Sequence, residues 1–559
     1  MKNLPAYGLF IVLILSACKD LKPVTEASSF YLDFNRVKSY PSNLPEDYTY
    51  TDYGGLAKAY HRIVFDFDAQ GPYLPFIRED ETYNSIGIAA YVGDGRRGSD
   101  GSQEAVTVLA AALSASLNGI DMADYRGRDY FPALNAFFSK AEGVILNNPG
   151  GRSADTSMWY VLYPAILYTQ LSLSHDNQAI MRTNTLTTIE SWYSAYEIIR
   201  DQEQFDFDLT GFDFIAQKAY RNGIWKEPDA AVGMAILFHY GYILTKAEKY
   251  LDAVFSLMDY IEGYFGGPLY ELLLYYAPVM TAELNALYGT HYDSTKALNR
   301  VFDGNSIPRG GWGSLSGKWG DYEVNGLFGS KTDGGGYAFS MNTFAAAGAI
   351  APLARYDTRY ARSIGKWLLH LHSNGRYFFS TETAREHQSL FTAAVQNVPS
   401  AAIRQAVPYE GIRNRYTGKS PWFGGDPTVY GWAETDLSLY SGAHTGIPGA
   451  LFEQTNQTGI LKVDLCATDV TRLDAWPTYL VYNPWQEDRE VNYTVQGGEG
   501  TDLFDAVTNT IAAGGIIGNT FLTIPAEGAM VIVEIPSGKP IKAEGQNYFV
   551  EDRYISSIR

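Results

Sequence analysis

The spacing of apolar residues changes once along this chain, and that change limits the fold to two differently built parts. From about residue 53 to about residue 396, apolar residues recur every three or four positions, which predicts helices. From about residue 459, short β-rich runs separated by turn signals replace them. Helices first and strands afterwards predict an α+β multidomain protein.

The helical part contains many segments that are apolar on more than one face, as expected when helices pack in inner and outer layers. The expected helices span residues 104–117, 155–172, 187–200, 229–244, 247–264, 269–288, 337–353 and 358–372. No fixed-period repeat is visible, so a regular solenoid is disfavoured. Paired helices on this scale predict an N-terminal (α/α)6 toroid over residues 53–458, with an irregular helical bundle as the alternative.

The C-terminal part, residues 459–559, is predicted to be a β-sandwich. Its strand signals are the runs ILKVDL, TYLVYN, EVNYTV and MVIVEI, with turn residues such as Asn483-Pro484 and Gly514-Gly515 between them. Packing against the helical domain is its expected role, and carbohydrate binding is the alternative.

The N-terminus resembles a bacterial lipoprotein signal. Lys2 is followed by an apolar run over residues 9–15 and by the sequence LSAC, which ends at Cys18. This run is far shorter than the roughly 20 residues that a bilayer span needs. By this resemblance residues 1–17 are a signal peptide and Cys18 is lipidated. The lipid would anchor the protein at the outer membrane of the cell envelope, facing the periplasm or the surface. An unlipidated signal is the alternative. Residues 18–52 are polar and proline-containing, which predicts a tether.

Charge and cysteine content remove several function classes. The formal net charge of −19 would repel nucleic acid, so no nucleic-acid partner is expected. With Cys18 lipidated, Cys466 stands alone, and with eight scattered histidines it gives no metal framework. We find no GxSxG elbow, P-loop or HExxH motif. The sequence therefore predicts no metal and no cofactor.

One glycine-rich segment, residues 310–342, is expected to be a long functional loop. It reads GGWGSLSGKWGDYEVNGLFGSKTDGGGYAFSMN, too glycine-rich for a helix or an ordinary strand. Trp312 and Trp319 have the faces that stack on a sugar ring, and Asp333 could handle its protons. An acid just before a helix is often only an N-cap, but the three glycines after Asp333 would let a ligand approach closely. Asn342, in the following helix, could hold a sugar hydroxyl.

A second candidate segment spans residues 409–426, YEGIRNRYTGKSPWFGGD. Glu410 is its candidate acid, and Trp422 could form another stacking wall. Arg413 could pair bidentately with the carboxylate of a uronic acid, with Arg415 or Arg309 in reserve. A solvated loop crossed by salt bridges is the alternative.

Two further segments carry weaker signals. Residues 78–104 gather acids around glycines, yet they do not match the EF-hand pattern, and Glu104 could be the N3 residue of a helix under a capping box. His444 lies among small residues in SGAHTGIP, where it could meet a ligand. A lone histidine is more often a hydrogen-bonded structural residue.

Four segments together resemble glycoside hydrolase family 154, within the glycan-degrading lipoproteins of Bacteroidetes. They are TDGGGYAFSMNTF at 332–344, YDTRYARSIGKWLLH at 356–370, YEGIRNRYTGKSPW at 409–422 and ATDV…WPTYLVYNP at 467–484. The resemblance implies a toroid with a C-terminal sandwich and a β-glucuronidase-like activity, and carries over no catalytic residue. The oligomeric state is open, with a homodimer as one option.

The resulting hypothesis is an exo-acting glycoside hydrolase that releases a uronic acid from a glycan. Glu410 would be the acid and Asp333 the base or nucleophile, with Asp426 and Asp94 in reserve. One alternative is a polysaccharide lyase, with His444 or a tyrosine as base and with Asn342 and Arg413 neutralising the uronate. The other alternative is a non-catalytic glycan-binding surface lipoprotein.

Overall fold

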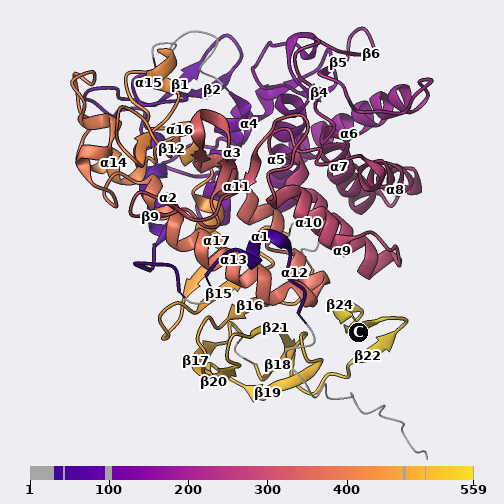
Figure 1. The fold of residues 1–559 in the computed structure, drawn as a ribbon. Helices are drawn as coiled ribbons and strands as arrows, with labels where there is room; N and C mark the ends of the chain where they lie inside the picture. Colours follow the sequence, from indigo (N-terminus) through magenta and orange to yellow (C-terminus); the bar gives the residue numbers. More distant parts are fainter. Residues whose placement is uncertain (1–30, 42–43, 95–103, 470–473, 498, 558–559) are drawn as a thin grey trace, which may run out of the picture.

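The computed structural model describes residues 31–41, 44–94, 104–469, 474–497 and 499–557. A helical body forms one end of the molecule, and a β-rich part, yellow in Figure 1, forms the other. The mixed helix and strand content agrees with the predicted fold class. Each predicted helix of the N-terminal part overlaps an observed one.

Six buried helical segments contact one another in a closed cycle, because each touches the next and the last touches the first. They are α3 (Ala105–Leu117), α5 (Trp159–Ser174), α7 (Ala230–Thr245), the continuous pair η5 (Leu273–Tyr276) and α9 (Ala277–Tyr288), α11 (Ser340–Ile350) and α17 (Gly446–Leu451). Most of their residues are buried on every face, which explains why their sequences lack a polar stripe.

A second set of helices lies outside this cycle and has one buried and one polar face. It comprises α2 (Tyr53–Val64), α6 (Ala179–Arg200), α8 (Glu248–Gly263) and α10 (Ser294–Phe302), together with α13 (Ala361–Asn374), which is the exception because all of its residues but Arg362 and Lys366 are buried. Each contacts a neighbouring helix of the cycle. The difference in burial between the two sets follows the apolar pattern of the sequence.

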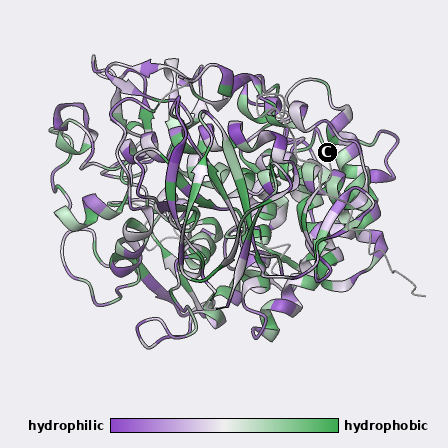
Figure 2. Ribbon diagram, turned by 90° about the horizontal axis from the view of Figure 1, so that it is seen from below, coloured by the Kyte–Doolittle hydropathy of each residue, from purple (hydrophilic) through white to green (hydrophobic). Residues whose placement is uncertain are grey.

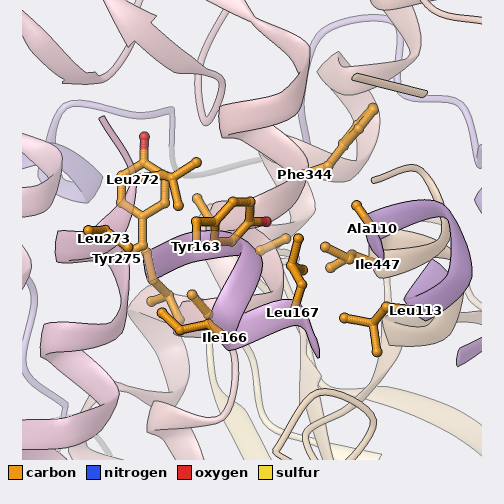
Figure 3. Packing of buried hydrophobic residues seen from close by; sticks show 14 of the residues in the cluster. Ala110, Leu113, Tyr163, Ile166, Leu167, Leu272, Leu273, Tyr275, Phe344 and Ile447 are labelled. Carbon is orange, nitrogen blue, oxygen red and sulfur yellow. The ribbon is translucent and has the colours of Figure 1, made fainter. Parts of the chain in front are cut away.

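The interior of the cycle is packed with side chains (Figure 3). Tyr163 and Leu167 of α5 lie between Leu273 of η5 on one side and Leu113 of α3 with Ile447 of α17 on the other. A cavity of about 50 Å³ remains between the side chains of this core. The cycle therefore encloses a core and not an open channel.

The glycine-rich segment 310–342 does not form the expected long loop. It supplies β7 (Trp312–Ser314), β10 (Phe328–Ser330) and β11 (Tyr337–Phe339) to a five-stranded antiparallel sheet, which β12 (Gly411–Arg413) and β13 (Trp422–Gly424) complete. A Cβ at Gly329 would collide with the Tyr337 carbonyl, so glycine here permits close strand pairing. Local composition could not show this, because two of the partner strands come from about 75 residues further on.

The C-terminal part is built around one six-stranded sheet. Its strand order is β14 (Phe452–Gln454), β15 (Leu461–Asp464), β16 (Thr478–Tyr482), β21 (Ala529–Pro536), β18 (Thr501–Asp505) and β19 (Thr510–Ile516). A separate pair consists of β17 (Arg489–Thr494) and β20 (Asn519–Ile524), and three short strands end the chain: β22 (Lys542–Glu544), β23 (Asn547–Val550) and β24 (Arg553–Ser557). The four predicted strand runs match β15, β16, β17 and β21.

Alternate residues of this sheet face two different cores. On β16, Leu480 and Tyr482 join the main core, whereas Tyr479 and Val481 join a smaller one with residues of β17 and β20. Helix α13 contacts β16 and β21, so the main core continues from the helices into the sheet. The hydrophobic strand segments crossing the centre of Figure 2 belong to this sheet, seen from below.

The N-terminal segment departs from its prediction where the structure describes it. Phe34, Val37 and Tyr40 are buried, and the Leu32 N–H donates to the Arg359 carbonyl at 2.8 Å. Residues 31–41 and 44–52 thus belong to the folded body and not to a tether. The predicted signal peptide and Cys18 lie outside the described residues. Within the described ranges, no helix combines the length and the apolar character needed to cross a membrane.

Candidate active site

A pocket of about 350 Å³ lies where the N-terminal ends of several buried helices meet the edge of the five-stranded sheet. Its lining residues are Ala90, Tyr91, Glu104, Trp159, Tyr160, Glu271, Arg309, Phe339, Met341, Glu410, Asp426, Trp432 and Tyr440. Glu104 and Phe339 are the N-cap residues of α3 and α11, and Trp159 begins α5. Helix N-termini carry partial positive charge, so this end of the helical body favours negative groups.

Glu410 is a buried acid of the pocket whose pKa is strongly raised. Only 4% of its surface is exposed, and its carboxyl group accepts hydrogen bonds from the Tyr91 hydroxyl at 2.9 Å, the Tyr337 hydroxyl at 2.7 Å and the Asp426 N–H at 2.7 Å. All three donors are neutral. Burial, with the nearby negative charge of Asp426, therefore raises the pKa of Glu410 to about 7. A carboxyl group of this kind holds its proton near neutral pH and can donate it.

Asp426 is the carboxylate beside it. Its side chain lines the pocket, is about one third exposed, and forms an ion pair with the Arg413 guanidinium. Burial raises the pKa of Asp426, and the charge of Arg413 acts in the opposite direction. Because its own N–H is bonded to Glu410, Asp426 places a second carboxyl group close to the first.

Asp333 does not line the pocket, although its negative charge is near enough to act in raising the pKa of Asp426. It is exposed in a short turn, Asp333–Gly335, between β10 and β11, and it is not among the residues that line the pocket. It does not cap the following helix either, since α11 begins only at Ser340. The structure thus pairs Glu410 with the reserve acid Asp426 and leaves Asp333 outside the pocket.

The three tryptophans expected as sugar-stacking walls are buried in or beside the five-stranded sheet. Exposed fractions are 2% for Trp312, 8% for Trp319 and 6% for Trp422, and none of them lines the pocket. The expectation of exposed indoles is wrong because the strands on which they lie, including β8 (Lys318–Trp319), fold against the body.

Different aromatic residues form the pocket walls. Trp159 and Tyr160 begin α5, Tyr440 lies on α16 (Leu439–Gly442), and Trp432 follows α15 (Pro427–Tyr430). Sequence reasoning assigned Trp159 to a helix and did not single out Trp432, which stands in no motif. Only the meeting of three separate segments makes these residues a site.

Arg309 is the guanidinium group among the lining residues. It forms an ion pair with Glu271 and lies 3.9 Å from the centroid of the Trp312 ring. Asn342 supports this wall from behind: its Nδ2 donates to the Glu271 carbonyl at 3.0 Å and to the Tyr275 hydroxyl at 3.1 Å. Asn342 is fully buried, so it positions the Glu271 segment and does not itself line the pocket.

Arg413 and His444 also lie behind the lining. Arg413 is occupied by Asp426, and its guanidinium lies 4.9 Å from the Tyr337 ring centroid. His444 is fully buried, with Nε2 3.0 Å from the Tyr163 hydroxyl and Nδ1 3.2 Å from the Tyr440 carbonyl. Burial lowers its pKa to about 4. His444 is thus a neutral, hydrogen-bonded structural residue, the second of the two roles considered for it.

The weaker acidic segment contributes one lining residue. Glu104 is the N-cap of α3 and not its N3 residue, and it faces the pocket. Asp94 is buried in a β-bridge with Ala433. Residues 95–103 lie outside the described ranges. Across the described part of the chain, no group of three or more His, Cys, Asp or Glu side chains is arranged to hold a metal ion.

Comparisons with known proteins return distant structural likenesses only. No family model matches the sequence, and the search of curated proteins finds no match. The solved structures that it resembles include a protein described as a glycoside hydrolase (9% identity, 78% of this chain and 73% of the other, TM-score 0.36). Another is a GH127 β-arabinofuranosidase (13% identity, 92% of this chain and 84% of the other, TM-score 0.38). A third is the endoglucanase CelQ from Clostridium thermocellum with cellobiose and cellotriose (10% identity, 91% of this chain and 99% of the other, TM-score 0.37). The functional conclusion therefore rests on the residues of the pocket.

Proposed function

We propose that this protein is a glycoside hydrolase whose acid is Glu410 and whose second carboxyl group is Asp426. One observation carries the proposal: Glu410 keeps a pKa of about 7 at the edge of a pocket walled by aromatic side chains, next to another carboxylate. Glycoside hydrolysis needs this pair, because one group must hold a proton while the other is ionised.

In the proposed reaction the scissile oxygen lies against Glu410, which protonates it as the bond to the anomeric carbon breaks. Asp426 then accepts a proton from the attacking water or attacks the anomeric carbon itself. The Arg413 guanidinium favours the ionised form of Asp426 and opposes the effect of burial on its pKa, whereas Glu410 has no cationic hydrogen-bond donor. The two environments thus separate the roles of two neighbouring acids.

We retain a uronic acid as the proposed substrate class, with Arg309 in place of Arg413 as its partner. Arg309 lines the pocket, whereas Arg413 does not. Arg309 would have to exchange its bond with Glu271 for one with the substrate carboxylate. Four carboxyl groups also line the pocket, namely Glu104, Glu271, Glu410 and Asp426. With four carboxyl groups and one guanidinium, the pocket would favour a neutral sugar over an acidic one unless Arg309 exchanges Glu271 for the substrate carboxylate. The test therefore compares acidic with neutral substrates.

The fold supports the same proposal. We propose that the closed cycle of buried helices and its outer set form the (α/α)6 toroid, and that the C-terminal sheet with the β17–β20 pair forms the sandwich. A glycan substrate, the lipid anchor at Cys18, the cell-envelope location and a homodimer complete the proposal. Anchor and location rest on the LSAC sequence alone.

The test is an assay of purified residues 19–559 on two sets of sugars, read for released sugar and for ultraviolet absorbance together. One set contains glucuronic- and galacturonic-acid-terminated disaccharides, and the other contains neutral gluco-, xylo- and arabino-oligosaccharides. Sugar release without new absorbance is expected. New absorbance would indicate elimination and a lyase, whose named residues His444, Asn342 and Arg413 do not line the pocket. Binding without turnover would favour the glycan-binding lipoprotein.

A matched pair of variants tests the second acid. Asp426→Asn should lower kcat on the cleaved glycan by about 10²-fold or more, because it removes the base or nucleophile. Asp333→Asn makes the same chemical change at an exposed position outside the pocket and should stay within about threefold of wild type. The reverse result would return the role to Asp333. Because Asp426 also pairs with Arg413, thermal unfolding of both variants should be compared with wild type.

A further inference from the structure

Two aromatic side chains at the pocket mouth remain exposed although most of the other large aromatics are buried. Trp432 is 41% exposed and Tyr430 is 65% exposed, whereas Trp312, Trp319 and Trp422 are each below 10%. Trp432 also lines the pocket. Leaving an indole in water forgoes the free energy of its burial, which points to a partner that covers it.

The two rings form a stacked pair. Their centroids are 5.4 Å apart and their planes differ by 27°, so the Tyr430 ring covers one face of the Trp432 indole. The pocket lies along another side of this indole, because Trp432 is a lining residue. Tyr430 is not a lining residue, so it backs the indole while the indole itself borders the pocket.

Backbone hydrogen bonds hold this pair in place without burying it. The Tyr430 N–H donates to the Asp426 carbonyl at 2.9 Å, and the Trp432 N–H donates to the Pro427 carbonyl at 2.8 Å. Gly431 between them has φ of +74°, a conformation that glycine adopts without strain. Further along, the Glu434 N–H donates to the Gly93 carbonyl at 3.0 Å. The platform is therefore already ordered in the free protein, so binding a ligand costs it less conformational entropy.

The platform is connected to the proposed acid through a short stretch of chain. Its turn begins at Asp426, whose N–H is bonded to the Glu410 carboxyl group. Glu410 is the acid that protonates the departing oxygen, so a ring attached to that oxygen lies near Glu410. Helix α15, which carries Tyr430, lies at the end of the molecule opposite the β-rich part (Figure 1).

We propose that Trp432, backed by Tyr430, binds the sugar ring on the leaving-group side, so that the substrate is a di- or oligosaccharide. This inference rests on the proposed function of the same site. The exposed carboxylate of Glu434, whose Oε2 accepts a hydrogen bond from the Tyr73 hydroxyl at 2.9 Å, lies two residues from the indole. It offers an acceptor for hydroxyl groups at the ring edge, which a sugar has and a plain aromatic leaving group lacks.

The test compares two substrates that share the same reacting sugar. One is the disaccharide cleaved in the first assay, and the other is the corresponding glycosyl fluoride, whose leaving group has no ring to stack. Trp432→Ala should lower kcat/KM on the disaccharide about tenfold more than on the fluoride, since aromatic stacking together with its buried area contributes on this scale. Tyr430→Ala should shift the same ratio in the same direction by about threefold, because it removes only the backing ring.

The control is Phe521→Ala, which removes an aromatic ring that is 63% exposed on β20, in the β-rich part. It should leave both rates unchanged. Equal losses of Trp432→Ala on disaccharide and fluoride would overturn the inference and make Trp432 a wall of the reacting sugar. If Trp432→Ala lowers kcat/KM on a nitrophenyl glycoside and not on the disaccharide, the platform would instead bind an aromatic leaving group.

The failure of the proposed function would look different. Wild-type protein would then turn over neither substrate, and the platform would be tested by calorimetric titration with the glucuronic-acid-terminated disaccharide. Weaker binding to Trp432→Ala than to wild type and to Phe521→Ala would support the platform, and equal or undetectable binding in all three would overturn it.

Discussion

Two buried glutamates of the molecule have pKa values shifted in opposite directions. Glu410 in the pocket and Glu323 on β9 (Tyr322–Glu323) are each 4% exposed. Burial acts to raise the pKa of both. Glu410 nevertheless ends at about 7, whereas Glu323 ends at about 2.

The partners of each carboxyl group explain the difference. Glu410 accepts hydrogen bonds from two tyrosine hydroxyls and one backbone N–H, all neutral. Glu323 Oε1 lies 2.6 Å from His370 Nδ1 and accepts from Asn325 at 2.7 Å, and its interactions with His370 and these other donors more than offset burial and lower the pKa of Glu323. A buried acid whose partners do not offset burial keeps its proton and can give it to a substrate, whereas one whose partners do is held as a structural anion.

The largest expected effect is on catalysis. Glu410→Gln should lower kcat by about 10²–10⁴-fold, because the amide is similar in size but cannot donate an acidic proton. Thermal unfolding should change little, since glutamine can still accept from one tyrosine. The rate on the cleaved disaccharide and the unfolding midpoint measure the two effects. A variant with wild-type kcat would remove Glu410 from the mechanism.

Glu323→Gln is the matched change in the other environment, and its effect should fall on stability. Removing the buried carboxylate leaves its hydrogen-bond donors without their partner, which lowers the free energy of unfolding by about 1–3 kcal/mol. The fraction that stays folded should keep its kcat, because Glu323 does not line the pocket. A low kcat with normal stability in this variant would break the contrast between the two glutamates.

The same contrast predicts opposite pH windows for stability. Relative to the ordinary value of 4.5, the pKa of Glu410 is raised, so its contribution to stability is full below about 4.5 and is lost as pH rises through about 7. The pKa of Glu323 is depressed, so its contribution is full above about 4.5 and is lost as pH falls through about 2. Unfolding midpoints measured from pH 2 to pH 8 should show the neutral-range slope weakened by Glu410→Gln and the acid-range slope weakened by Glu323→Gln. Equal slopes in both variants would contradict these assignments.

The helices and strands were largely predictable, because burial on several faces and alternation on one face both leave local patterns. Residues 229–244 and the observed α7 differ by one residue at each end, and the run MVIVEI falls inside β21. The small sheet was not predictable. The strands that segment 310–342 contributes are only three residues in length, and two further strands of the sheet come from a distant part of the chain.

The site was only partly predictable for a related reason. Glu410 and Asp426 stand in one segment that combines acids, arginines and a tryptophan, and that composition pointed to chemistry. The donors Tyr91 and Tyr337, which complete the environment of Glu410, come from elsewhere in the chain. The prediction that Trp312 and Trp422 stack on a sugar was wrong about their exposure, because composition shows that an indole is present but not whether its face is covered.

The smallest expected effect concerns a single hydrogen bond to Glu410. The alkaline limb of kcat/KM should lie near pH 7, because Glu410 must be protonated to act. The bond from Tyr337 stabilises the ionised carboxylate and so lowers the pKa of Glu410. Tyr337→Phe should therefore move this limb upward by less than about one pH unit, which corresponds to one hydrogen bond of about 1 kcal/mol. A downward shift would mean that Tyr337 stabilises the protonated acid, and an unmoved limb would mean that another group determines the pH of this limb.

Tyr322→Phe is the control, because its ring packs on Tyr377 and Phe423 and its hydroxyl does not reach Glu410.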